Sequence, residues 1–192
     1  MAGTVLAIGD NLDGLPGKVT REPVFGLAAK WVPVELQRQA QVLRDGIKGR
    51  PALETSVAQV EYALSQADAG DLPAARIQVD NAASALAALK PANPEQLANA
   101  RVAQARIALA QRDLEAGCAA AKQALDLRPP EKPGWRHAEA LSVHGECLAA
   151  RREFALARSD LQSALADLRR VRGVDHWMTR PVAQALQSLP KD

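Results

Sequence analysis

An internal repeat of about 40 residues constrains the fold of this chain more than any other sequence feature. The segments GDLPAAR (70–76), RDLEAGC (112–118) and REFALAR (152–158) align with one another at spacings of 42 and 40 residues. Small side chains at fixed points of a repeat allow one helix to cross another at short distance. The repeat therefore predicts a stack of antiparallel helix pairs. Small residues recur at matching offsets ahead of the three segments and behind them: Ala63, Ala105 and Gly145 ahead, and Ala82, Ala124 and Ala164 behind.

The composition favours helices over strands. Hydrophobic residues make up 47% of the chain and aromatic residues only 3%, so the core must be built from Ala, Leu and Val. Strands favour aromatic and β-branched residues, which makes a β-sandwich a poor fit. We therefore predict an all-α fold, an antiparallel helix-pair solenoid of about three repeats plus a C-terminal capping helix. An ordinary helical bundle whose Ala-rich sequence mimics a repeat is the alternative.

Proline and glycine predict where these helices begin and end. The segment NPEQ (93–96) is a strong helix start, because Asn can cap, Pro fits the first position and Gln completes a capping box. The prolines between 129 and 133 enforce a break, since proline lacks the amide hydrogen and clashes with the preceding turn. Gly173 marks another break, and a last short helix is expected from Thr179 to a point before Pro190.

The N-terminal part of the chain differs from the repeat region in composition and in predicted secondary structure. Residues 1–33 contain the runs TVLAI and PVFGL between glycine- and proline-rich stretches, which predicts short strands or extended segments. A first helix is predicted from Val34 to Asp45, and residues 46–51 break it. We therefore divide the chain into an N-terminal segment with its linker helix (1–50), a short α/β or extended appendage, and a helical repeat domain (51–192).

Charge and cysteine usage argue against several classes of protein. The chain has 24 Lys and Arg against 22 Asp and Glu, a net charge of +2, with no stretch basic enough for a nucleic-acid binder. No window approaches the roughly 20 apolar residues of a membrane span, and the first ten residues do not resemble a signal peptide. Cys118 and Cys147 lie inside helical patterns, so we expect free thiols, no disulfide and a cytoplasmic location.

The sequence lacks strong catalytic signatures. It contains no GxSxG, no Gly-rich phosphate loop and no HExxH. His137, His144 and Cys147 fall near one another on one predicted helix, but a closed zinc site needs four ligands and no fourth is placed by sequence. We interpret these three as packing residues. The chain is therefore expected not to be an enzyme and to need no metal or cofactor.

Over residues 55–192 the repeat resembles the tetratricopeptide repeat family, in a form longer than usual. Gly145 and Pro129 occupy the family's glycine and helix-ending proline positions. The first helices of two repeats depart from the pattern, because polar side chains stand where the family has large apolar ones: Gln59, Gln66, Arg101 and Gln104. The best-matching positions lie in the second helices: Ala75, Gly117 and Ala157, followed by Ala82, Ala124 and Ala164.

The resemblance implies that a protein partner binds on a concave face formed by the first helices. The Lys/Asn set with which related domains clamp a terminal carboxylate is absent from that face. We expect a partner helix or extended segment, held by apolar contacts plus Arg106 and Glu146, which hold the same repeat position 40 residues apart. The valines on this face have inter-repeat core as their alternative role. The predicted binding residues are Val57, Val60, Asn99, Val102, Arg106, Glu139, Ser142 and Glu146.

Residues 1–41 carry a second resemblance, through REPVFGLAAKWVP (21–33), the upstream LAIG and LDGLPG, and the downstream ELQRQAQ. This stretch is similar to part of the cytoplasmic domain of the large export-gate protein of bacterial type III secretion systems. The resemblance implies a chaperone-docking role for Glu22 and Phe25, against the alternative that Phe25 and Trp31 are core residues. The family's next strand, Gly-x-x-Val-Val-Asp, is missing here. The chain thus joins a segment that resembles an export-gate protein to a helical repeat region, either as a natural fusion or through a rearranged reading frame.

Three functions remain open from the sequence. The first is a non-catalytic adaptor or co-chaperone that serves type III secretion, with a secretion chaperone or the export apparatus as its partner. The second is an export-gate remnant fused to a repeat module without independent activity. The third is the sensory repeat module of a bacterial signalling protein, cut away from its kinase or transcription regulator.

Overall fold

The computed structural model of the chain describes residues 52–129 and 134–190, and all the regular secondary structure in these ranges is helical. The predicted all-α fold is thereby confirmed for this part of the chain. The predicted strands within 1–33 and the predicted helix 34–45 lie outside the described residues. The helices are α4 (Ala52–Asp68), α5 (Leu72–Ala88), α6 (Pro94–Ala110), α7 (Leu114–Asp126), α8 (Trp135–Ala150), α9 (Phe154–Arg172) and α10 (Thr179–Ser188).

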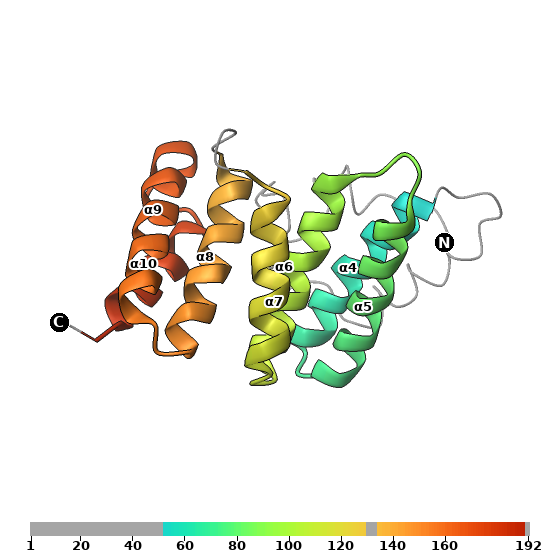
Figure 1. Cartoon of the computed structure of the whole chain (residues 1–192), viewed down its shortest axis with the longest axis horizontal. Coiled ribbons are helices and arrows are strands. Elements are labelled where there is room, and N and C mark those ends of the chain that lie inside the picture. Colours follow the sequence, from blue (N-terminus) through green and yellow to red (C-terminus); the bar gives the residue numbers. More distant parts are fainter. Residues whose placement is uncertain (1–51, 130–133, 191–192) are drawn as a thin grey trace, which may run out of the picture.

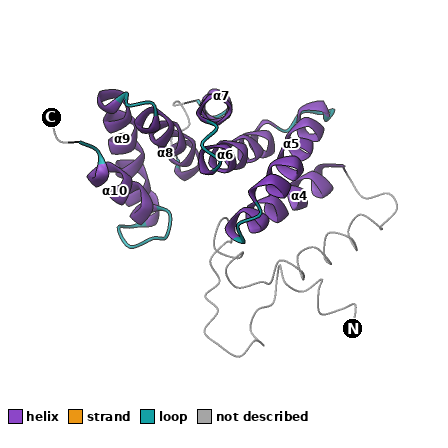
Figure 2. Ribbon diagram, turned by 90° about the horizontal axis from the view of Figure 1, so that it is seen from below, coloured by secondary structure: helices purple, strands orange, loops and turns teal. Residues whose placement is uncertain are grey.

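The helices pack as consecutive antiparallel pairs. Helix α4 lies against α5, α6 against α7, and α8 against α9, while α10 covers α9 at the C-terminal end (Figure 1). Each pair also contacts the next one through α5 with α6 and through α7 with α8. Seen end-on, the pairs follow an arc, with α5 and α7 toward its outer side and α4 and α6 toward its inner side (Figure 2). This is the helix-pair solenoid that the 40- to 42-residue spacing predicts.

The three turns inside the helix pairs, between α4 and α5, α6 and α7, and α8 and α9, share one backbone conformation. This shared turn accounts for the alignment of the repeat segments. Gly70, Arg112 and Arg152 have positive φ angles of 91°, 63° and 66°. The residue after each of them donates its amide to a carbonyl five residues back, the pattern that closes a helix C-terminus. Asp71 and Asp113 then cap the next helix, each accepting an amide hydrogen bond of 3.1 Å three residues on.

Further predicted helix boundaries in the described residues are confirmed for α6, α9 and α10. Asn93 caps α6 by accepting a hydrogen bond of 3.1 Å from the Gln96 amide, with Pro94 in the first turn. Gly173, with a φ of 93°, ends α9. Helix α10 begins at Thr179, whose hydroxyl donates to the Gly173 carbonyl at 2.8 Å, and it ends before Pro190.

Small residues occupy the helix crossings, as the repeat predicts. Gly117 in α7 lies so close to α6 that an added Cβ would stand 3.0 Å from the Leu109 side chain. A Cβ on Gly145 would stand 2.9 Å from Cγ of Leu161 in α9. Such short approaches leave no room for a larger side chain. The alanines at the repeat positions are fully buried: Ala63, Ala75, Ala82, Ala105, Ala124, Ala157 and Ala164.

The expectation of two free cysteines is wrong. Cys118 on α7 and Cys147 on α8 form a disulfide, with their Cα atoms 5.4 Å apart. Both residues lie inside helices, as predicted, but α7 and α8 are neighbours, and this lateral contact brings the two thiols together. The bond ties the second repeat to the third. Paired cysteines remove the support that free thiols gave to a cytoplasmic location.

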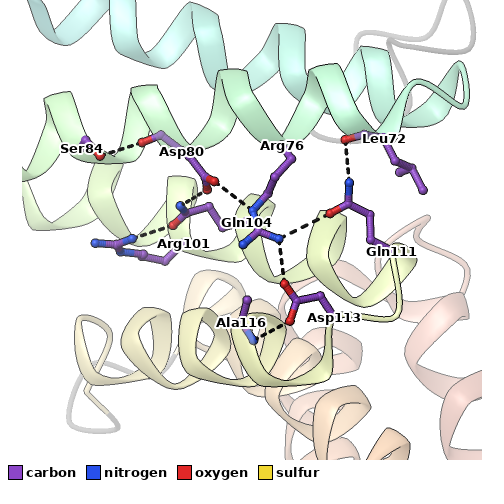
Figure 3. A network of polar contacts seen from close by, with 9 residues as sticks. All are labelled: Leu72, Arg76, Asp80, Ser84, Arg101, Gln104, Gln111, Asp113 and Ala116. Carbon is purple, nitrogen blue, oxygen red and sulfur yellow. Dashed lines mark hydrogen bonds and ion pairs between the residues drawn. The ribbon is translucent and has the colours of Figure 1, made fainter.

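Two of the polar residues that depart from the family pattern, Arg101 and Gln104, belong to a network between α5, α6 and α7 (Figure 3). Gln104 donates to Asp80 at 2.6 Å and accepts from Arg101 at 2.7 Å. Asp80 also receives Arg76 at 2.9 Å. Gln111 donates to the Leu72 carbonyl at 3.0 Å. Hydrogen bonds between the first and second repeats thus replace the apolar contacts expected there.

Candidate functional site

A groove of about 550 Å³ opens on the inner side of the solenoid. It crosses the C-terminal end of α4, the start of α5, the last turns of α6 and the middle of α8, and residues of α9, of α10 and of the loop between them form its far wall. Its walls are largely apolar and its floor carries charged side chains. The lining residues from α4 to α8 are Leu64, Ala67, Asp68, Leu72, Arg106, Ile107, Leu109, Ala110, Glu139, Ser142 and Glu146.

The start of α10 and the loop before it form the far wall of the groove. Trp177, Met178, Pro181 and Val182 line it together with Leu168 of α9. Met178 and Val182 are at the same time buried in the core that α10 shares with α8 and α9, so the wall is fixed in place. The sequence analysis did not assign this wall to the site. The available signal was Trp177, which follows Trp135 by 42 residues and so continues the repeat.

A charged network forms the floor of the groove. Glu139 on α8 is buried and receives two guanidinium groups, from Arg106 at 3.2 Å and from Arg128 at 3.4 Å. Arg128 lies beneath the groove surface, where it also donates to the Arg136 carbonyl at 2.8 Å and to Asn99. Burial lowers the pKa of Arg128, and the field of Glu139 acts in the opposite direction. The floor is thus ordered before any partner arrives.

Glu146 differs from Glu139 in its surroundings. Glu146 holds the position in the third repeat that Arg106 holds in the second, and it lines the same groove. Burial raises the pKa of the Glu146 carboxyl, and the positive charge of Arg106 offsets part of that effect. Arg106 therefore acts on Glu146 through space, as the sequence analysis predicts from their equivalent positions. The direct ion pair of Arg106, however, is with Glu139, which lies about two turns before Glu146 on α8.

The structure separates the eight predicted binding residues into two groups. Arg106, Glu139, Ser142 and Glu146 line the groove. Val60 and Val102 are buried in the cores between helices, the alternative role that the sequence left open for the valines. The remaining two do not line the groove: Asn99 pairs with Arg128, and Val57 is half-buried on α4. Glu22 and Phe25, the predicted export-gate residues, lie outside the described residues.

The three residues interpreted from the sequence as packing residues, His137, His144 and Cys147, each make a specific contact. His137 donates through Nδ1 to the Arg128 carbonyl at 2.6 Å, and His144 pairs with Asp160 at 2.7 Å. Cys147 is in the disulfide with Cys118. Within residues 52–129 and 134–190, no group of three His, Cys, Asp or Glu side chains is placed to hold a metal ion.

Two further observations concern the chain as a whole. None of the helices in the described ranges is long and apolar enough to span a bilayer. A comparison with protein-family models finds no match, and no curated protein matches the chain.

Proposed function

We propose that this chain is a non-catalytic protein-binding scaffold whose groove holds a helix or an extended segment of a partner protein. The observation that carries the proposal is the groove itself, which runs across the inner helices of all three repeats. Apolar walls around a few ordered polar groups are typical of recognition sites, and a volume of about 550 Å³ takes several side chains. A partner helix would fill it with anchors spaced three and four residues apart.

We further propose that the repeats are of the tetratricopeptide type. The shared turn at Gly70, Arg112 and Arg152 supports this, as do the small residues at the crossings of each pair. Gln104, a polar residue at an apolar position of the family pattern, binds Asp80 across the first repeat junction, so it modifies the packing without changing the helix order. A scaffold of this kind uses its concave side for binding, which is the side that holds the groove.

A role in type III secretion is the finer form of this proposal. Its support is the sequence of residues 1–41 alone, through REPVFGLAAKWVP (21–33). The partner would then be a secretion chaperone or a component of the export apparatus, recognised by the groove of the repeat domain.

The groove can be tested by filling it at one end. Ala110 is an exposed residue at the end of α6 that lines the groove, and Ala150 is the equivalent residue 40 positions on, exposed at the end of α8 but outside the lining. Peptides selected by the full chain from a phage-displayed random library would be measured against Ala110→Trp and Ala150→Trp. We expect Ala110→Trp to weaken binding about tenfold or more, because an indole occupies the site, and Ala150→Trp to leave it unchanged. Equal affinities for both variants and the unmodified chain would overturn the proposed function.

A further inference from the structure

Glu146 is an acidic group of the groove whose burial the charge of Arg106 offsets only in part. It is half-buried on the α8 wall, and burial raises the pKa of its carboxyl. Within residues 52–129 and 134–190, no hydrogen bond or ion pair reaches the Glu146 carboxylate. Partial burial of a carboxylate that has no partner costs free energy, so this position gains free energy when a cation pairs with it.

The cations of the groove are already committed elsewhere. Arg106 and Arg128 both bind Glu139, at 3.2 and 3.4 Å. Two guanidinium groups therefore surround one carboxylate, while the other carboxylate on the same helix receives only the distant field of Arg106. The surface that a partner meets at Glu146 thus offers a negative charge, although the chain as a whole carries a net charge of +2.

The apolar walls of the groove strengthen its preference for a partner that places a cation beside Glu146. Trp177, Met178 and Val182 lie on one side of the groove, and Leu64, Leu72 and Leu109 on the other. Apolar walls keep water away, and electrostatic interactions are strengthened where water is excluded. A partner that places a cation beside Glu146 gains from the pairing. A partner that places an aliphatic side chain there covers the carboxylate without replacing its water, which costs affinity.

From this arrangement we propose that the groove binds a segment of a partner protein in which a Lys or Arg side chain, flanked by large apolar residues, pairs with Glu146. This inference rests on the proposed function, and it specifies the chemistry of the partner. The apolar neighbours fill the walls and the cation supplies the charge that Arg106 and Arg128 give to Glu139. An acidic segment is disfavoured, since its carboxylates would face Glu146.

The test compares peptide pools selected from a phage-displayed random library by the full chain and by its Glu146→Gln variant. We expect the unmodified chain to enrich Lys or Arg among large apolar residues, and the variant to keep the apolar preference but lose the basic one. Glu115→Gln is the matched control, because Glu115 is exposed in the first turn of α7 and lies outside the groove. Its pool should resemble that of the unmodified chain.

A double-mutant cycle then assigns the contact. For one selected peptide, replacing its basic residue by Met and replacing Glu146 by Gln should each weaken binding about tenfold or more, and the two changes together little further. Peptides that compete for the groove, as judged by their sensitivity to Ala110→Trp, but carry no enriched cation would overturn this inference and leave the proposed function standing. Additive losses in the cycle would overturn it as well. A pool insensitive to Ala110→Trp would remove the proposed function and this inference together.

Discussion

Enlarging a side chain at a helix crossing should damage the fold far more than the same change on the outer surface of the same helix. Ala157 and Ala166 both lie in α9, but Ala157 is fully buried against α8 and Ala166 is exposed. The two Ala→Leu substitutions share nearly the same small loss of helix propensity. Their difference therefore isolates the packing of the crossing.

The expected magnitude follows from the absence of free space. Ala157 shares its core cluster with Ala138, Leu161 and Leu165. At the same crossing, a single carbon added to Gly145 would lie 2.9 Å from Cγ of Leu161, which is shorter than van der Waals contact. Inserting three carbons into such a core costs about 1–3 kcal/mol. For a chain of this size, each kcal/mol lowers the melting temperature by about 2–4 °C.

The assay is urea unfolding followed by circular dichroism, with melting temperatures as a second readout. Ala157→Leu should lower the urea midpoint without changing the slope, whereas Ala166→Leu should stay close to the unmodified chain. Ala124→Leu, at the equivalent crossing of α7, should behave like Ala157→Leu because Ala124 is also fully buried. Equal midpoints for the three variants would refute the assignment of these positions to crossings.

Four further predictions concern the disulfide, the caps, the groove and the N-terminal segment. Reduction of Cys118–Cys147, a bond across 29 residues, should destabilise the fold by up to about 3–4 kcal/mol, and thermal unfolding with and without reductant measures it; no change would show that the bond does not form. Glu153→Asp should stabilise α9 by about 0.5–1 kcal/mol, since Asp caps at the two equivalent turns and Glu153 makes no capping bond; a lower urea midpoint would contradict this. Glu146→Gln should become progressively more stable than the unmodified chain as the pH rises above about 4.5, because the raised pKa of Glu146 makes the folded state bind its proton more tightly; a constant difference across urea series from acidic to neutral pH would contradict it. Removing residues 1–48 should leave helicity and melting temperature nearly unchanged if the repeats fold by themselves, and a loss of several degrees would show that the removed segment packs onto them.

The fold could be predicted from the sequence because its determinants are local and repeated. Small residues at fixed offsets mark crossings, and the turn segments mark helix ends, so one alignment of three segments predicts six helices. The turn conformation also favours particular residues, as at Gly70 and at the capping Asp71 and Asp113. These signals depend on a few neighbouring residues and therefore survive in a single sequence.

The candidate site could be predicted only in part, because it depends on rotations and neighbours between helices. Repeat position placed Arg106 and Glu146 on one face, but it could not show that Glu139 takes the guanidinium of Arg106. Two valines predicted on the same face, Val60 and Val102, are buried in the cores between helices. The contact of α7 with α8 that joins Cys118 to Cys147 likewise has no local signature.

The far wall of the groove shows a second reason why the candidate site could be predicted only in part. Helix α10 is one helix after three pairs, and its sequence predicts a cap over the end of the stack. Only the packed structure shows that the turn before it brings Trp177 and Met178 across to face α6. The polar residues at apolar positions of the family pattern give a similar example. The sequence shows Arg101 and Gln104 as departures from the pattern, but it does not show that Arg101 binds Gln104 or that Gln104 binds Asp80.

The most direct measurement of the central claim is the site at which a bound partner touches the solenoid. A peptide selected by the full chain would carry a photoreactive group in place of one apolar anchor, and mass spectrometry would locate the cross-links after irradiation. The groove account predicts cross-links to its walls, at Leu72, Trp177 and Met178. Cross-links confined to Ile77 and Leu156, large apolar side chains exposed on α5 and α9 outside the groove lining, would contradict it.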